Sequence, residues 1–127
     1  MKENKLSEII IASALDVHRA LGPGLLENAY EECLAHELTL RNIPFQRQVL
    51  VPVNYKGICI ELGYRLDLVV DNSVIVELKV VESLLPIHES QVLTYLKMSG
   101  KRLALLINFN VRLLKDGIKR IVLNLPD

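Results

Sequence analysis

Four charged residues interrupt an otherwise aliphatic stretch, RLDLVVDNSVIVELKV at positions 65–80. They are Arg65, Asp67, Glu77 and Lys79. If residues 71–73 form a three-residue hairpin loop, Val70 lies opposite Val74. The same register places Asp67 opposite Glu77 and Arg65 opposite Lys79. Because side chains alternate between the faces of a strand, the four charges share one face and the Leu and Val residues at 66, 68, 70, 74, 76 and 78 share the other.

This register brings like charges together. Like charges directly opposite each other destabilise a strand pair, so a hairpin shaped for stability alone would place Asp67 opposite Lys79. Two neighbouring carboxylates are suited to a divalent cation, because Mg²⁺ binds through one or two carboxylates together with water and phosphate. The alternative is a solvated surface on which Arg65 pairs diagonally with Glu77, and Asp67 with Lys79. The hairpin alone leaves both interpretations open.

The elements that must position these residues follow from the hydrophobic periodicity. Apolar residues recur every three or four positions in the helices and alternate in the strands. We predict helices over 6–21, 25–41 and 87–99, and strands over 45–53, from 58 onward, across the hairpin, over 103–109 and over 118–123. Pro52 suggests that the first strand lies at a sheet edge. This order predicts an α/β fold: a single domain, 1–127, with a mixed central β-sheet flanked by α-helices.

Composition narrows the classes of function. The 127 residues have a formal net charge of zero, so no overall basic field attracts the chain to nucleic acid or to a membrane. Aromatic residues make up 5% and Trp is absent, which disfavours a large base-stacking platform. No apolar run approaches the roughly 18 residues of a membrane span. We therefore expect a cytoplasmic protein that does not bind membranes, with Cys33 and Cys59 reduced and in the core.

Two further motifs accompany the hairpin. GLLENAY at 24–30 has Gly24, Glu27 and Tyr30 in a G-x-x-E-x-x-Y pattern, and HESQVLTYLK at 88–97 has Gln91 and Tyr95 one helical turn apart. With Asp67 and the ELK at 77–79, these motifs resemble the PD-(D/E)XK nuclease superfamily and, within it, the GxxExxY family. The resemblance covers nearly the whole chain. It implies a restriction-endonuclease-like core and hydrolysis of phosphodiester bonds.

The resemblance also implies a role for each matching residue. The metal ligands would be Asp67, Glu77 and Glu27, and the catalytic set would be Asp67, Glu77, Lys79 and Glu27. The substrate-binding residues would be Gln91, Tyr95, Tyr30 and Arg65. The implied cofactor is Mg²⁺ or Mn²⁺, and the implied partner is nucleic acid, DNA in preference to RNA, with a homodimer as a further expectation. The sequence departs from the superfamily's name at Leu66, which stands where that name has Pro.

Simpler interpretations remain for several of these residues. Tyr30 and Tyr95 could equally anchor helices to the core, and His88 fits a helix cap better than a base. Glu31 fits a solvated carboxylate better than a fourth acidic site residue. Cationic residues that could contact phosphate, or could belong to an ordinary charged surface, are Arg41, Arg47, Lys97, Lys101 and Arg102. At the level of the whole chain, the alternative to a nuclease is a nuclease-like binding or assembly module that acts with a partner and catalyses little.

Overall fold

The computed structural model describes residues 2–126, with the side chains of residues 62 and 63 excepted. Five strands form one sheet in the order β1-β2-β3-β4-β5. The strands are β1 (Phe45–Tyr55), β2 (Ile58–Val70), β3 (Val74–Lys79), β4 (Leu103–Asn108) and β5 (Ile118–Val122). The helices are α1 (Lys2–Leu21), α2 (Glu27–Leu40) and α3 (Pro86–Ser99), with a short 3₁₀ helix, η1 (Leu114–Gly117), before β5. β3 and β4 are parallel and joined through α3, whereas the other neighbours are antiparallel. The predicted α/β domain with a mixed sheet is confirmed.

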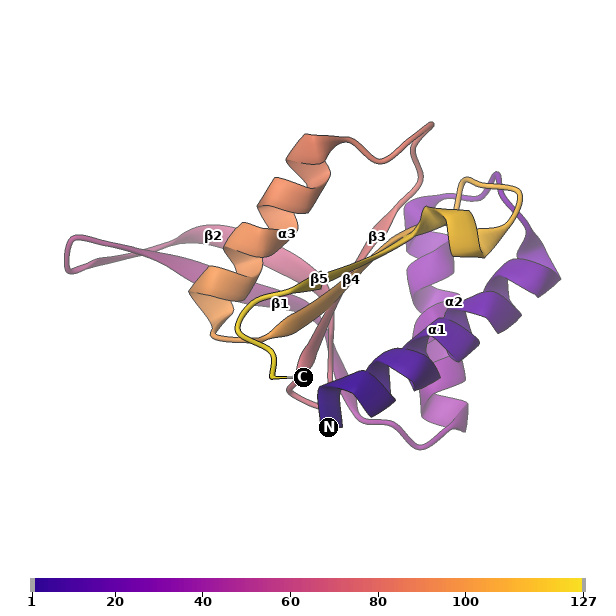
Figure 1. The fold of residues 1–127 in the computed structure, drawn as a ribbon, viewed down its shortest axis with the longest axis horizontal. Helices are drawn as coiled ribbons and strands as arrows, with labels where there is room; N and C mark the ends of the chain where they lie inside the picture. The colour runs from indigo at the N-terminus through magenta and orange to yellow at the C-terminus, as the bar shows by residue number, and fades with distance from the viewer. Residues whose placement is uncertain (1, 127) are drawn as a thin grey trace.

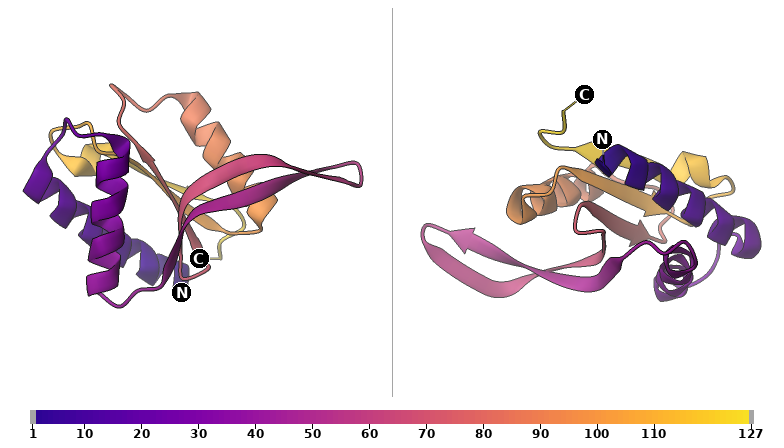
Figure 2. Two further views of the ribbon diagram at one scale, coloured as in Figure 1. Left: turned by 180° about the vertical axis from the view of Figure 1, so that it is seen from behind. Right: turned by 90° about the horizontal axis from the view of Figure 1, so that it is seen from below.

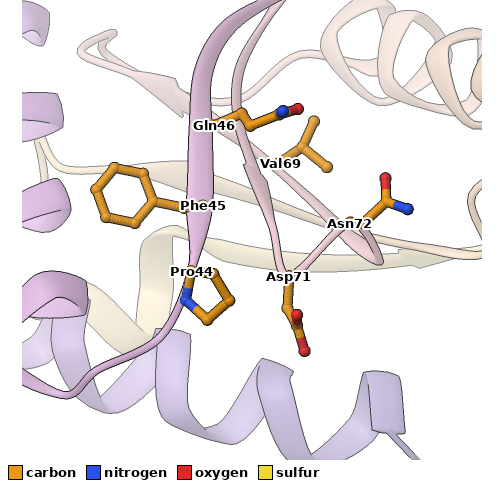
Figure 3. A pocket seen from close by; sticks show the side chains of 6 residues that line it. All are labelled: Pro44, Phe45, Gln46, Val69, Asp71 and Asn72. Atoms are coloured by element: carbon orange, nitrogen blue, oxygen red, sulfur yellow. The ribbon is translucent and has the colours of Figure 1, made fainter.

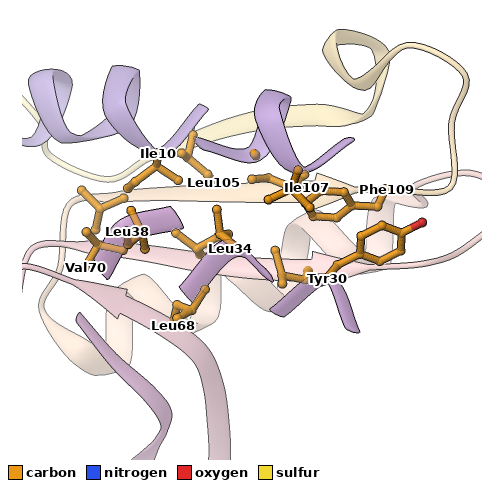
Figure 4. Close-up of a cluster of buried hydrophobic side chains, with 14 of the residues drawn as sticks. Ile10, Tyr30, Leu34, Leu38, Leu68, Val70, Leu105, Ile107 and Phe109 are labelled. Atoms are coloured by element: carbon orange, nitrogen blue, oxygen red, sulfur yellow. The ribbon is translucent and has the colours of Figure 1, made fainter. Parts of the chain in front are cut away.

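The helices cover the two faces of the sheet (Figures 1 and 2). α1 and α2 pack on one face, where Ile10, Leu34 and Leu38 meet strand residues such as Leu105 (Figure 4). α3 packs on the other face through Val92 and Leu96. β4 is buried along its whole length because both of its faces are covered. Its continuous apolar run follows from this position. Within residues 2–126, no helix is both long enough and apolar enough to cross a membrane.

β1 and β2 form a hairpin arm that extends well beyond the rest of the sheet (Figure 2). β2 pairs with β3 only through Leu68, Val69 and Val70, and it pairs with β1 over nearly its whole length. β1 is an edge strand, as Pro52 suggests, and the register of the arm shifts next to this proline. Cys59 lies exposed on the arm and Cys33 is half-buried in α2; both are free thiols. The expectation that both lie in the core is therefore wrong for Cys59.

The loop between α1 and α2 carries Gly24 close to the start of α2. Gly22 and Gly24 have φ angles of 67° and 105°, in the left-handed region that favours glycine. The predicted second helix begins at Glu27 rather than at position 25. Leu26, immediately before it, has an extended backbone (φ −68°, ψ 149°), and the backbone N–H of Leu25 donates to the Tyr30 hydroxyl (3.1 Å). Glu27 thus occupies the first turn, where the helix dipole favours a carboxylate.

Candidate functional site

The predicted register of the β2–β3 hairpin is confirmed from its loop to the pair Leu68 and Val76. The regular backbone pairing of β2 with β3 ends there, and hydrogen bonds from backbone N–H groups to side chains connect the strands beyond that point. The N–H of Asp67 donates to Oε1 of Glu77 (3.0 Å), and the N–H of Leu78 donates to Oδ2 of Asp67 (2.8 Å). The two carboxylates therefore bridge the strands where β2 begins to leave the sheet. Each has one oxygen tied to the opposite backbone and one oxygen outside these two hydrogen bonds.

The predicted assignment of the hairpin side chains to the two faces of the sheet fails at one position, Leu66. Leu68 and Leu78 face α1 and α2 as expected, but Leu66 packs with the cluster under α3. The regular alternation of β2 is lost between Leu66 and Leu68. Opposite Asp67, Gln48 in β1 has a φ of 52°, a conformation that non-glycine residues rarely adopt. The irregular backbone at this point turns Leu66 to the other face.

The charges of Asp67 and Glu77 are not neutralised by a diagonal ion pair. Within residues 2–126, neither carboxylate, nor Arg65, nor Lys79, takes part in a salt bridge. Glu77 is only 6% exposed. Burial, followed by the charge of Asp67, raises the pKa of Glu77 to about 8. Burial also raises the pKa of Asp67, against the stabilising N–H of Leu78. The solvated-surface interpretation does not fit two like charges of which Glu77 is buried and Asp67 is half-buried.

Glu27 reaches this pair from α2, about forty residues earlier in the chain. Its pKa is raised, first by partial loss of hydration and then by the charge of Asp67, while the ammonium of Lys79 opposes the rise. The charge of Glu27 in turn contributes to the raised pKa of Glu77. The four residues of the predicted catalytic set therefore act on one another electrostatically at one place, although three separate elements carry them.

Asp67, Glu77 and Glu27 are the acidic side chains that could bind a divalent cation. Within the described part of the chain, no three acidic, His or Cys side chains lie together closely enough to hold a metal by themselves. Glu27 therefore does not complete a ready-made three-ligand site with Asp67 and Glu77. Mg²⁺ usually keeps several waters and binds through one or two carboxylates. The oxygens of Asp67 and Glu77 outside their backbone hydrogen bonds fit that smaller requirement.

Glu31, one turn after Glu27, is not the solvated residue that we expected. It is 6% exposed and accepts hydrogen bonds from Nε and Nη2 of Arg47 (3.0 and 2.8 Å) and from Nε2 of Gln48 (2.9 Å). A hydrogen bond from Gln48 also favours the ionised form of Asp67. The Gln48 amide thus links two acidic residues. Gln48 was not predicted from the sequence as a residue of the site. The one local feature that could have indicated it is a polar amide side chain between Arg47 and the apolar residues of the strand.

Most of the cationic residues that could contact phosphate are engaged within the protein. Arg41 pairs with Asp16 and Glu37, and Arg102 pairs with Glu3. Arg47 also reaches Glu32, and Lys101 donates to Asn72 (3.0 Å). Lys97 is exposed on α3. The interpretation of these residues as an ordinary charged surface accounts for four of the five.

Of the predicted residues of α3, Tyr95 is the one that senses the charges of the carboxylates. Tyr95 is half-buried, and its pKa is raised by burial, then by Glu77, Tyr64 and Asp67. Gln91 is exposed and lines a small pocket with Tyr95 and with Tyr64 of β2. Sequence reasoning did not single out Tyr64. Nδ1 of His88 accepts the backbone N–H of Leu85 (3.0 Å), so His88 caps the helix, as expected.

Tyr30 lies elsewhere, and its position disagrees with a role in substrate binding. It has no exposed surface, and its ring stacks on Phe109 with centroids 4.4 Å apart. Its hydroxyl donates to the carbonyl of Gly22 (2.5 Å) and accepts from Leu25. Both hydrogen bonds hold the loop that precedes Glu27. Tyr30 is an anchor for α2, whereas Arg65 is exposed on the arm, as a substrate-binding residue must be.

A pocket of about 350 Å³ lies at the start of β1 and the β2–β3 turn (Figure 3). It is lined by Pro44, Phe45, Gln46, Val69, Asp71 and Asn72. None of the residues that the sequence predicts to carry chemistry lines this pocket. The candidate site is therefore the carboxylate pair with Lys79 and Glu27, and this pocket is a separate feature.

Comparison with known proteins identifies the superfamily of the chain. No curated protein and no solved structure matches the chain. A model of the PD-(D/E)XK nuclease superfamily matches residues 4–121, which include all three helices in large part and the whole sheet except its last residue. The matched range includes Asp67, Glu77 and Lys79. The chain therefore belongs to the PD-(D/E)XK nuclease superfamily.

Proposed function

We propose that this protein is a divalent-metal-dependent nuclease that hydrolyses phosphodiester bonds of nucleic acid. The observation that carries the proposal is the pair of half-buried Asp67 and buried Glu77, each hydrogen-bonded to the other's strand and, within residues 2–126, engaged in no salt bridge, with Lys79 two residues further along β3. A fold that needed only stability would have neutralised or solvated such a pair. Membership of the nuclease superfamily supports the same chemistry.

Asp67 and Glu77 would hold the metal, with Glu27 acting through a bound water. Bound there, Mg²⁺ or Mn²⁺ would lower the pKa of a water and offset charge that develops on the phosphate. The backbone of Lys79 is fixed, because its carbonyl accepts the N–H of Phe109 (3.0 Å) and its strand is paired with β4. Its ammonium, a compact donor, would bind a non-bridging phosphate oxygen and orient the attacking water. Gln91, Tyr95 and Arg65 would contact the substrate.

We also propose that the chain belongs to the GxxExxY group of the superfamily. The three signature residues have distinct physical tasks in this fold. Gly24 supplies a backbone conformation with φ of 105°, Glu27 faces the carboxylate pair, and Tyr30 ties the loop between them to the core. A signature that fixes the entry of α2 in this way supports a site role for Glu27.

The test is cleavage by the purified protein with Mg²⁺, with Mn²⁺ and with EDTA. Single- and double-stranded DNA and RNA of matched sequence serve as substrates, because we expect DNA to be preferred. Lys79→Ala and Asp67→Asn should each lower the cleavage rate about 10²-fold or more. Lys119→Ala on β5 is the matched control for loss of one exposed lysine. Circular dichroism checks that each variant is folded.

Two results would overturn the proposal. One is cleavage that EDTA or Asp67→Asn leaves unchanged, which would point to a contaminant. The other is the absence of cleavage from every substrate under all metal conditions, which would favour the binding or assembly module. Sedimentation analysis of the same protein checks the predicted homodimer.

A further inference from the structure

A small pocket lies between α3 and the arm, and it includes Gln91 and Tyr95, two of the residues proposed to contact the substrate. Its volume is about 160 Å³, well below the roughly 300–1,000 Å³ of a pocket that encloses a whole small ligand. It is lined by Tyr64, Ile87, Ser90, Gln91, Thr94 and Tyr95. The pocket has room for one ring system rather than for a complete nucleotide or cofactor.

Tyr95, which lines this pocket, shows where the pocket lies relative to the carboxylates. Tyr95 packs against the cluster under α3 that contains Leu66, next to Asp67 in β2, and Ile75, two residues before Glu77 in β3. The charges of Glu77 and of Asp67 also help to raise the pKa of the Tyr95 hydroxyl, after burial. The Tyr64 ring lies 5.5 Å from that of Tyr95, at 45°. The pocket therefore lies between α3 and β2, on the side of the sheet where Tyr95 packs on residues close in sequence to the carboxylate pair.

The lining has the chemistry of a site for an uncharged ring. None of its six residues is charged, so it offers nothing to neutralise a phosphate. Tyr64 and Ile87 both line the pocket, and at 51% and 57% exposure both leave apolar surface open to a ligand. Between these surfaces stand the hydroxyls of Ser90 and Thr94 and the amide of Gln91, which can bond the polar edge of a base.

We propose that this pocket holds one nucleobase of the substrate, that of a nucleotide adjoining the phosphate to be cleaved. This inference rests on the proposed nuclease function. The Tyr64 and Tyr95 rings already contact each other, so the base does not enter between them. It stacks on the exposed face of Tyr64, with its edge toward Gln91.

The proposal defines the substrate class. A base inside a duplex is stacked on its neighbours and is unavailable to a tyrosine unless the enzyme extrudes it. The substrate is therefore single-stranded, or frayed, at the cleaved position. One aromatic contact of this kind is compatible with the low aromatic content, because stacking on a single side chain contributes roughly 5- to 150-fold in affinity.

A binding experiment tests the pocket without cleavage. Oligonucleotides that carry 2-aminopurine at one position, moved stepwise along the strand, are mixed with the Lys79→Ala protein in Ca²⁺. Stacking on Tyr64 should quench the fluorescence of one position, in single-stranded DNA or in RNA, and the two substrates are compared directly. Tyr64→Leu in this background should abolish the quench, whereas Tyr64→Phe should keep it. Tyr55→Leu is the control, because Tyr55 is a comparably exposed tyrosine (57%) at the tip of the same arm.

A kinetic experiment separates stacking from a merely structural role. With the active protein, replacing the quenched base by an abasic nucleotide should raise KM about as much as Tyr64→Leu does, and the two changes together should add nothing. Independent, additive effects would overturn the proposal, as would a quench that survives Tyr64→Leu or is equally strong in a duplex. If no substrate is cleaved in the presence of metal, the nuclease function is refuted instead. The fluorescence quench measures binding, so its result does not depend on cleavage.

Discussion

Removal of the negative charge of Glu77 should stabilise the metal-free protein, and the gain should grow with pH. Glu77 is buried beside Asp67, and its pKa is raised from 4.5 to about 8. The folded state therefore keeps a proton on this residue at pH values where the unfolded chain has released it. Folding stability that this proton contributes is fully present below about pH 4.5 and is lost as pH rises through 8. A Gln at position 77 has no such proton to lose.

The magnitude follows from the size of the rise. At about 1.36 kcal/mol per pH unit, the rise from 4.5 to about 8 corresponds to about 5 kcal/mol above pH 8, and to about 3 kcal/mol at pH 7. Glu77→Gln keeps an oxygen that can accept the Asp67 N–H, but its amide N–H₂ needs a new partner in a buried place. We therefore expect a net gain of about 2 kcal/mol at pH 7.

Urea unfolding in EDTA at pH 5, 7 and 8.5 measures this effect. The difference in free energy of unfolding between Glu77→Gln and the parent should be near zero or negative at pH 5 and should increase at each step. Glu8→Gln, at an exposed position of α1, is the control for loss of one carboxylate. A difference that does not change with pH would refute the reasoning, because it would mean that Glu77 titrates alike in the folded and unfolded states.

Three further predictions concern the same region. In the parent protein, Mg²⁺ at 100 times its dissociation constant should increase the free energy of unfolding by about 2.7 kcal/mol. The stability of Asp67→Asn, measured by its melting temperature, should hardly respond to Mg²⁺. A response of equal size in both proteins would exclude Asp67 as a ligand. Tyr30→Phe keeps the ring stack but removes two hydrogen bonds, so urea unfolding should show a loss of about 1–3 kcal/mol, and an unchanged stability would contradict the anchor role. Arg47→Met leaves the buried Glu31 with only its hydrogen bond from Gln48 and should cost about 1–3 kcal/mol by the same measurement, more than Glu31→Gln does. Equal losses would argue that the ion pair does not stabilise the fold.

Much of the site could be predicted from local pattern. The alternation of side chains along the strands places Asp67, Glu77 and Lys79 on one face of a hairpin. The turn at residues 71–73 sets the register, which the structure confirms. The capping role of His88 follows equally from its place near a helix start. These features depend on neighbours within about a dozen residues, where strand and helix periods determine which side chains can meet.

Other features could not be predicted because they do not follow from the local hydrophobic periodicity of the sequence. The exposed thiol of Cys59 depends on an arm that leaves the sheet, and the burial of Glu31 depends on Arg47 approaching from β1. Leu66 changes face because the backbone is irregular where Gln48 lies opposite Asp67. Each of these outcomes is set by how separate elements bend and dock.

The sequence by itself determined the two carboxylates, the lysine beside them and the secondary structure that carries them, since spacing along one hairpin decides what shares its face. Only the tertiary structure decided what surrounds them. α2 packs across the sheet and brings Glu27 to the pair, while α3 and the arm place Tyr95 and Tyr64 on the other side. The physical reason is that contacts between distant segments depend on the packing of whole faces, and many sequences with the same periodicity could pack those faces differently.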